Sequence, residues 1–250
     1  MDYDIAGDSH VGTVRQTNQD RVEWRRSHDG RQALLVLADG MGGHQGGEIA
    51  SQLAVAAVLD SLLPALSASV APDSAAVRER LDAAFELAAA RIQKEQGGDV
   101  RLEKMGTTLV VAWVIDHSAF IGHIGDSRCY LVAGGGVRCL TRDDTVVQNM
   151  IEDGSITETE APRVPFRNVL TRALGASNDA TPSFRLQELA PGEGLLLCSD
   201  GLTGALPETW WSETIGQGPD ADAAVQSLID QSLENGAGDN VSVVLMMLKD

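Results

Sequence analysis

Three aspartates lie beside short apolar runs and could together bind a cation. Asp39 and Asp200 each follow such a run and precede a glycine, while Asp239 comes just before one. The ends of strands gather at the rim of a sheet, so carboxylates that are far apart in the sequence can meet there. Ligand sets made only of oxygen suit Mg²⁺ or Mn²⁺, and the absence of Cys or paired His ligands disfavours zinc.

Each aspartate also has a structural explanation that needs no ligand. Asp-Gly is a common turn pair, and Asp-Asn before a strand is an ordinary end of a loop. For any one of the three acids, this explanation is the better one. Because Asp20 and Asp126 also flank predicted strands, the set as a whole favours a cation site.

The stretch 33–47, ALLVLADGMGGHQGG, sets one of these acids between a predicted strand and a predicted helix. The run from Ala33 to Ala38 is apolar and short, which is typical of a strand covered on both faces. Five of the eight residues after Asp39 are glycine, so the backbone there can bend freely or approach a ligand closely. The stretch therefore predicts a strand, an acidic turn and a helix around a cation.

The composition describes an acidic chain of 250 residues with a formal net charge of −17. Such a surface repels nucleic acid and anionic membranes, so we expect neither as a partner. An anionic substrate would need a local positive charge at its site. Cys129, Cys139 and Cys198 form no CxxC pair, which argues against a disulfide framework and against a thiolate zinc site.

No targeting or spanning segment is evident in the sequence. The first ten residues lack the basic and apolar regions of a secretory signal. The longest uninterrupted apolar run, Leu109–Ile115, is too short for a transmembrane helix. With no linker-like stretch and no internal repeat, the chain is expected to form a single domain over residues 1–250, in a cytoplasmic and monomeric protein.

Two helices and a series of strands must position the acids. The helices are predicted over 46–63, ending at Pro64, and over 75–96, each with a polar face that points away from a sheet. From Met105 onward, successive strands on short connections must be antiparallel neighbours, and their continuous apolar runs indicate cover on both faces. The pattern predicts an α+β fold with two antiparallel sheets packed face to face and helices outside.

A less regular segment, about 141–175, interrupts this series of strands. It contains a short predicted helix, Val146–Glu152, two prolines, and arginines at 163, 167 and 172. A segment of this length with little core character is typical of an excursion over the surface or of a lid near a site.

Six motifs occur in a fixed order along the chain: GDSHVGTVRQTNQD (7–20), LADGMGGHQGG (37–47), GTT (106–108), GDSR (125–128), LCSDG (197–201) and GDNV (238–241). In this order and spacing they resemble the metal-dependent PPM/PP2C-type serine/threonine protein phosphatases, in their bacterial branch. Single DG and GD pairs are frequent, but the ordered set is highly specific and covers essentially the whole chain.

The resemblance implies a four-layer α-β-β-α sandwich with a binuclear Mn²⁺ or Mg²⁺ centre at one end. By position, Asp39 would bridge the two ions and the Gly40 carbonyl would bind one of them. Asp200 and Asp239 would complete the protein ligands. Asp126, together with Asp200, resembles the ligands of a third and weaker ion.

The same resemblance gives two further residues a part in the reaction. Arg15 resembles the arginine that grips the phosphate, and it can offer two parallel donors, which lysine cannot. Asp20 resembles the acid that supports metal-bound water. Two cations would lower the pKa of a bridging water and neutralise the phosphoryl oxygens during in-line attack. They would also supply the positive charge that an acidic protein lacks.

Some positions depart from the family pattern. Gln19 stands where many relatives carry a glutamate that holds metal through water, so that hold should be weaker here. Met41 stands where animal members have a histidine thought to protonate the leaving group. His44 lies nearby and is a candidate general acid, although a hydrogen bond within the loop is the favoured interpretation. His123, in an apolar strand, is expected to be a core residue.

The segment 141–175 falls where the bacterial branch has its mobile flap. Arg163 and Arg167 in this segment could contact phosphopeptides. Solvated charges beside Glu158 and Glu160 are the favoured interpretation, because surface pairs usually contribute little.

The expected function is hydrolysis of phosphoserine and phosphothreonine in phosphoproteins, in opposition to a bacterial Ser/Thr kinase. One alternative is a catalytically silent PP2C-like scaffold, which would not need Arg15 or the acids. Another is a phosphatase dedicated to one anti-sigma-factor antagonist, which the long flap disfavours. The expected partners are phosphorylated proteins and a cognate kinase.

Overall fold

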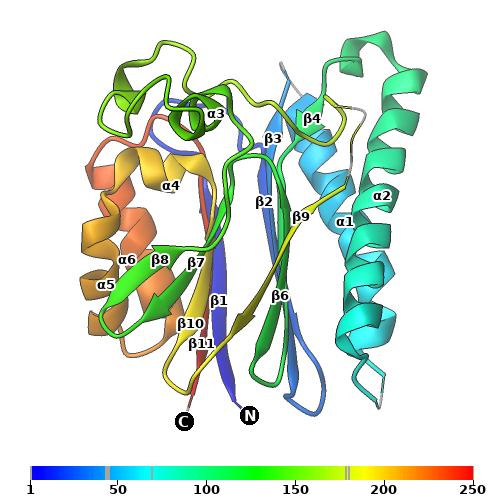
Figure 1. Ribbon diagram of the computed structural model, residues 1–250, viewed down its shortest axis with the longest axis vertical. Coiled ribbons are helices and arrows are strands. Elements are labelled where there is room, and N and C mark those ends of the chain that lie inside the picture. The colour runs from blue at the N-terminus through cyan, green and yellow to red at the C-terminus, as the bar shows by residue number, and fades with distance from the viewer. Residues whose placement is uncertain (1, 43–45, 69, 178, 180, 250) are drawn as a thin grey trace.

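Two antiparallel sheets form the centre of the computed structural model, which describes residues 2–42, 46–68, 70–177, 179 and 181–249 (Figure 1). One sheet has the order β1 (Tyr3–His10), β11 (Val241–Leu248), β10 (Gly194–Cys198), β7 (Arg128–Ala133) and β8 (Gly136–Cys139). The other has the order β2 (Asp20–Arg26), β3 (Gln32–Met41), β5 (Leu109–Ile115), β6 (Ser118–Ile124) and β9 (Ser183–Glu188), and the short β4 (Gly106–Thr107) pairs with β3.

Helices cover the outer face of each sheet (Figure 1). The β3-containing sheet is covered by α1 (Gly46–Leu66) and α2 (Ser74–Gly98). The β11-containing sheet is covered by α4 (Asp200–Ala205), α5 (Glu208–Gln217) and α6 (Ala221–Glu234). The remaining helical pieces are η1 (Val100–Leu102), α3 (Val146–Glu152) and η2 (Ala161–Arg163). The predicted four-layer α-β-β-α sandwich is thereby confirmed.

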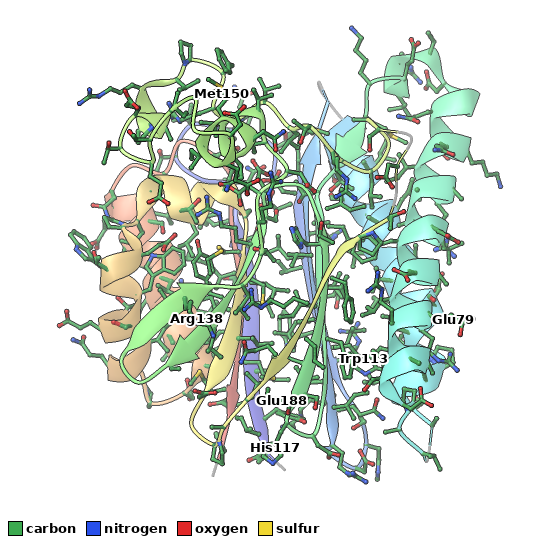
Figure 2. All side chains as sticks on the ribbon, viewed as in Figure 1. Glu79, Trp113, His117, Arg138, Met150 and Glu188 are labelled. Carbon is green, nitrogen blue, oxygen red and sulfur yellow. The ribbon has the colours of Figure 1, made fainter. Side chains whose placement is uncertain are left out.

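The side chains of β3 alternate between two cores, which explains its continuous apolar run. Leu34 and Val36 pack against the α1 and α2 layer, together with Trp113, which Figure 2 labels on that side of the sheets. Leu35 and Leu37 pack between the two sheets. A third core lies between the other sheet and α4, α5 and α6. Full burial of each large apolar side chain is worth about 1.5–3 kcal/mol, so these cores hold the layers together.

The first helix is longer than predicted. Pro64 was expected to end it, but α1 continues to Leu66 with Pro64 inside its last turn. Proline has no amide to donate and crowds the carbonyl four residues earlier, so it ends or bends many helices, but α1 continues for two residues beyond Pro64. The amide of Ser67, the first residue after α1, still donates to the Leu63 carbonyl over 3.0 Å.

Among the described residues, α1 is long and apolar enough to cross a membrane by length and composition alone. Half of that apolar window is buried in the protein. Helices in the cores of globular domains pass the same test, so this is weak evidence for a membrane span. The packing of α1 against β3 and α2 accounts for its apolar composition.

The segment 141–175 lies over one end of the sandwich and carries α3 and η2 (Figure 1). Figure 2 labels Met150 in this segment, and His117 and Glu188 at the opposite end of the molecule. A ligand that binds at the Met150 end of the sheets must therefore lie beside this segment.

Candidate metal centre

Asp39 and Asp20 are direct neighbours on paired strands. They face each other in the register of β2 and β3. The predicted strand 33–38 ended before Asp39, whereas β3 continues to Met41 because its last residues pair with Gly106 and Thr107 of β4. The prediction that Asp39 lies in a turn is therefore wrong: β2 pairs with its backbone on one side, and on the other side the Thr108 amide, between β4 and β5, donates to its carbonyl over 2.9 Å.

Buried hydroxyl groups fix the backbone of Asp39. Its amide donates to Thr108 Oγ1 over 3.0 Å, and its carbonyl accepts from Thr107 Oγ1 over 2.8 Å. Thr108 Oγ1 also lies 2.7 Å from Ser127 Oγ, in the turn that carries Asp126. Two hydroxyls thus connect the Asp39 strand to the Asp126 turn.

Gly40 allows the start of α1 to approach β3 closely. A Cβ atom added to Gly40 would lie 2.1 Å from the Gly47 carbonyl oxygen, far inside van der Waals contact. Only glycine fits at this position, so the close packing beside Asp39 requires the glycine of the Asp39-Gly40 pair.

Asp20 is buried, with 7% of its surface exposed, whereas Asp39, Asp126, Asp200 and Asp239 are half-buried. Its Oδ2 accepts a hydrogen bond from the Ser242 hydroxyl over 2.6 Å. Within the described part of the chain, its Oδ1 has no hydrogen-bond partner. Burial raises the pKa of Asp20, and the hydrogen bond from Ser242 partly offsets the rise. A buried carboxylate oxygen without a donor is costly unless a ligand or water completes it.

Four half-buried aspartates line one cavity of about 710 Å³. Asp39 comes from β3, Asp126 from the turn between β6 and β7, Asp200 from the first position of α4, and Asp239 from the loop before β11. Asp20 does not line this cavity and lies beside Asp39 in the sheet. The structure therefore gathers acids that are separated by up to 200 positions in the sequence.

Burial and mutual repulsion raise the pKa values of these acids. Burial raises the pKa of Asp39 well above its ordinary value, and the charges of Asp20, Asp200 and Asp126 add to the rise. Burial and the charge of Asp200 raise the pKa of Asp126 to about 7. Burial followed by the charge of Asp239 raises the pKa of Asp200 to about 6. Such a cluster is poorly compensated by protein groups alone and favours a bound cation.

Arg15 lies at the edge of the same cavity. Its Nη2 donates to Asp239 Oδ2 over 2.7 Å, and about half of its side chain is exposed. The arginine expected to bind phosphate is therefore paired with an acid expected to bind metal.

The donor chemistry of the site fits a hard divalent cation. Four carboxylate side chains come from residues that line one cavity, and Gly40 also lines it. Across the described ranges of the chain, no three His, Cys, Asp or Glu side chains already form a complete ligand group. For these side chains to surround a cation together, some of them must move, and Asp239 must separate from Arg15.

Asn240 is a positioning residue that the motif analysis left without a role. Its Nδ2 donates to the carbonyls of Val11 and Thr17 over 2.9 and 3.0 Å, and its Oδ1 accepts from the Gln19 amide over 2.9 Å. It thereby holds the loop that carries Arg15. The motif GDNV contained this residue, but an Asn before a strand has many uses, so its partners could not be inferred.

The remaining candidates are two histidines and two arginines of the segment 141–175. His44 lies outside the described residues. His123 is buried, with Nε2 2.7 Å from the Arg142 carbonyl oxygen, as expected for a core residue. Arg163 and Arg167 are exposed, and Arg167 lines a neighbouring cavity of about 480 Å³ that also reaches Asp126 and Asp200.

Comparisons with known proteins agree with this geometry. A family model described as protein phosphatase 2C matches residues 6–235. The serine/threonine protein phosphatase PstP of Mycobacterium tuberculosis is 37% identical over 247 residues, which cover 98% of this chain and 45% of that protein. The chain thus spans less than half the length of PstP. The protein phosphatase PhpP of Streptococcus pneumoniae is 32% identical over 244 residues, covering 96% of this chain and 95% of PhpP.

The fold is also similar to that of a solved structure. The crystal structure of the catalytic domain of PstP in complex with two manganese ions superposes with a TM-score of 0.85 at 35% identity. The match covers 99% of each chain.

Proposed function

The chain belongs to the protein phosphatase 2C family, and from this premise we propose that it hydrolyses phosphoserine and phosphothreonine in proteins. The observation that carries the proposal is the cavity lined by Asp39, Asp126, Asp200 and Asp239 with Arg15 at its edge. Carboxylates and one arginine around a single cavity suit cation-assisted attack on a phosphate ester. PstP and PhpP are named as protein phosphatases, which supports the same reaction here.

The proposed cofactor is a pair of Mn²⁺ or Mg²⁺ ions, in keeping with the two manganese ions of the PstP catalytic domain. Asp39, the Gly40 carbonyl, Asp200 and Asp239 would hold the pair. Asp126, together with Asp200, would hold a third and weaker ion. When bound, these ions supply positive charge that makes water more acidic and neutralises the phosphoryl oxygens.

Residues of the chain orient the reactants around that charge. Arg15 binds two phosphate oxygens with its planar guanidinium, after exchanging Asp239 for the substrate. Asp20 would support the attacking water from its position beside Asp39, through Oδ1, the oxygen with no hydrogen-bond partner in the described chain, while Ser242 fixes Oδ2. Thr108 keeps the Asp39 backbone in register.

The wider setting follows from the same proposal. The substrates are proteins phosphorylated by a Ser/Thr kinase, and the protein acts in the cytoplasm as a monomer. One domain over 1–250 carries the activity, with a flap over about 141–175. Continuous cores between the four layers support the single domain, and the position of 141–175 beside the cavity supports its role as a flap.

The decisive experiment is phosphate release from a phosphothreonine peptide with and without Mn²⁺, for the wild type and for Asp39→Ala. We expect release only by the wild type with Mn²⁺. The matched control is Asp153→Ala, which removes an exposed acid of the flap and should leave the rate unchanged. Equal release from all samples would rule out the mechanism. Binding of the phosphopeptide without release, under any metal condition, would favour a silent scaffold.

A further inference from the structure

Asp144 is a buried acid that no step of the proposed reaction uses. Only 3% of its surface is exposed. Its Oδ2 accepts from the Gly125 amide over 3.0 Å, and its own amide donates to the Gly125 carbonyl over 3.0 Å. Asp144 therefore holds Gly125 at two points, directly before Asp126 in the chain.

The turn at Gly125 depends on this support. Gly125 has φ +104°, and an added Cβ atom would lie 2.6 Å from Thr108 Cγ2. A glycine turn of this kind is flexible in the unfolded chain and needs contacts to fix it. A charged acceptor on a buried amide is among the stronger hydrogen bonds that a protein can form. The carboxylate of Asp144 thus determines where the turn presents Asp126.

The same residue joins the two ends of the segment 141–175. The Asp144 carbonyl accepts from the Thr171 amide over 2.8 Å. Its Oδ1 lies 3.4 Å from Nη1 of Arg172 and 3.9 Å from Nη1 of Arg142. Thr171 and Arg172 line the acid cavity. One buried carboxylate is therefore shared by the beginning of the segment, its end and the Asp126 turn.

We propose that Asp144 is a positioning residue that couples the segment 141–175 to the cation held at Asp126. Filling that cation site orders both Gly125 and Thr171, because both are bound to Asp144. Conversely, displacement of the segment by a protein substrate shifts Asp126 and weakens the cation there. The inference rests on the proposed function only in taking Asp126 as a cation ligand.

The first test measures Mn²⁺ binding to the full chain by calorimetry, with no substrate present. For Asp144→Ala we expect the dissociation constant of the weakest Mn²⁺ site to rise about tenfold or more, as is usual when the support of a ligand is lost. The tighter sites should keep their affinities. Asp144→Asn, whose amide oxygen can still accept from Gly125, should recover part of the loss. Asp153→Asn removes the same charge from an exposed position of the segment and should match the wild type.

The second test needs no variant of Asp144 and so does not depend on how that variant folds. In the wild type, raising Mn²⁺ from the tight to the weak binding range should slow hydrogen exchange at Gly125 and Thr171 together. Asp126→Asn should abolish the slowing at both. Slowing at Gly125 alone, or an unchanged weak site in folded Asp144→Ala, would overturn the proposal, as would the lack of any weak site in the wild type. Failure of phosphate release would overturn only the proposed function, because neither test measures activity.

Discussion

Arg15 Nη2 lies 2.7 Å from Asp239 Oδ2, so the arginine holds the carboxylate by one of its two outer nitrogens. The pair brings together a loop after β1 and the loop before β11, which are 224 positions apart in the sequence. A guanidinium at this position neutralises one acid of a crowded cluster. A divalent cation at Asp239 would do the same more strongly, so cation and arginine compete for this carboxylate.

The competition predicts separate effects of Arg15 on substrate and on metal. Arg15→Ala should lower kcat/KM for a phosphothreonine peptide by roughly 10- to 150-fold, since hydrogen bonds to charged groups contribute about 1.5–3 kcal/mol. Arg15→Lys should keep only part of the wild-type kcat/KM. Calorimetry should show Mn²⁺ affinity unchanged or increased in Arg15→Ala. A loss of Mn²⁺ affinity as large as that of Asp239→Asn would contradict this division of roles.

Metal should stabilise the fold, because it relieves repulsion among the acids and binds only the folded chain. At a free Mn²⁺ concentration 100 times the dissociation constant, the gain is about 2.7 kcal/mol, or roughly 5–10 °C in Tm for a chain of this size. Differential scanning calorimetry with Mn²⁺ and with a chelator measures the difference. Asp39→Asn serves as the control and should respond far less. Identical midpoints for the wild type in both buffers would refute the prediction.

The chelated protein should lose stability as pH rises. The folded pKa values of Asp126, about 7, and Asp200, about 6, lie above the value of about 3.9 for an unfolded aspartate. Between those limits the folded state binds more protons than the unfolded state, so its stability falls as pH increases from about 4 to about 7.

Urea unfolding at several pH values, in chelator, checks this dependence. The free energy of unfolding of the wild type relative to Asp126→Asn should decline across the window, since the amide does not titrate. Saturating Mn²⁺ should remove the decline. A difference between the two proteins that stays flat from pH 4 to pH 7 would show that Asp126 is not destabilised by its neighbours.

The contact between Gly40 and Gly47 predicts a sharp difference between two glycines. Gly40→Ala should destabilise the fold by about 1–3 kcal/mol or more and weaken Mn²⁺ binding, because the new Cβ atom pushes β3 away from α1. Gly216→Ala, in α5, meets no atom within 4 Å and should be neutral or stabilise by about 0.5–1 kcal/mol. Chemical denaturation measures both. Equal stability of the two variants would refute the argument from close approach.

The layers could be predicted from sequence because they depend on local patterns. The continuous apolar runs, the short connections after Met105 and the two helices with one polar face each were sufficient to predict two covered antiparallel sheets. The extension of β3 through Asp39 could not be predicted, since its partner β4 has only two residues and carries no periodic signal.

The acids of the cavity were predictable as a set, whereas the residues that hold them were not. Asp39, Asp200 and Asp239 share a visible context at the ends of apolar runs. Asp144 and Asn240 resemble ordinary polar loop residues until their partners are known. Their hydrogen bonds join residues that are 19 and 229 positions apart. Such bonds depend on the completed fold, so they cannot be predicted from the local sequence.

The pairing of β1 with β11 also sets the order in which the molecule can become functional. β11 lies between β1 and β10, begins two residues after Asp239 and carries Ser242, whose hydroxyl donates to Asp20. During synthesis the acids of β2 and β3 therefore emerge long before the strand that completes their surroundings. Contacts of such long sequence separation are slow to form, so the surroundings of these acids stay incomplete until β11 inserts into the sheet.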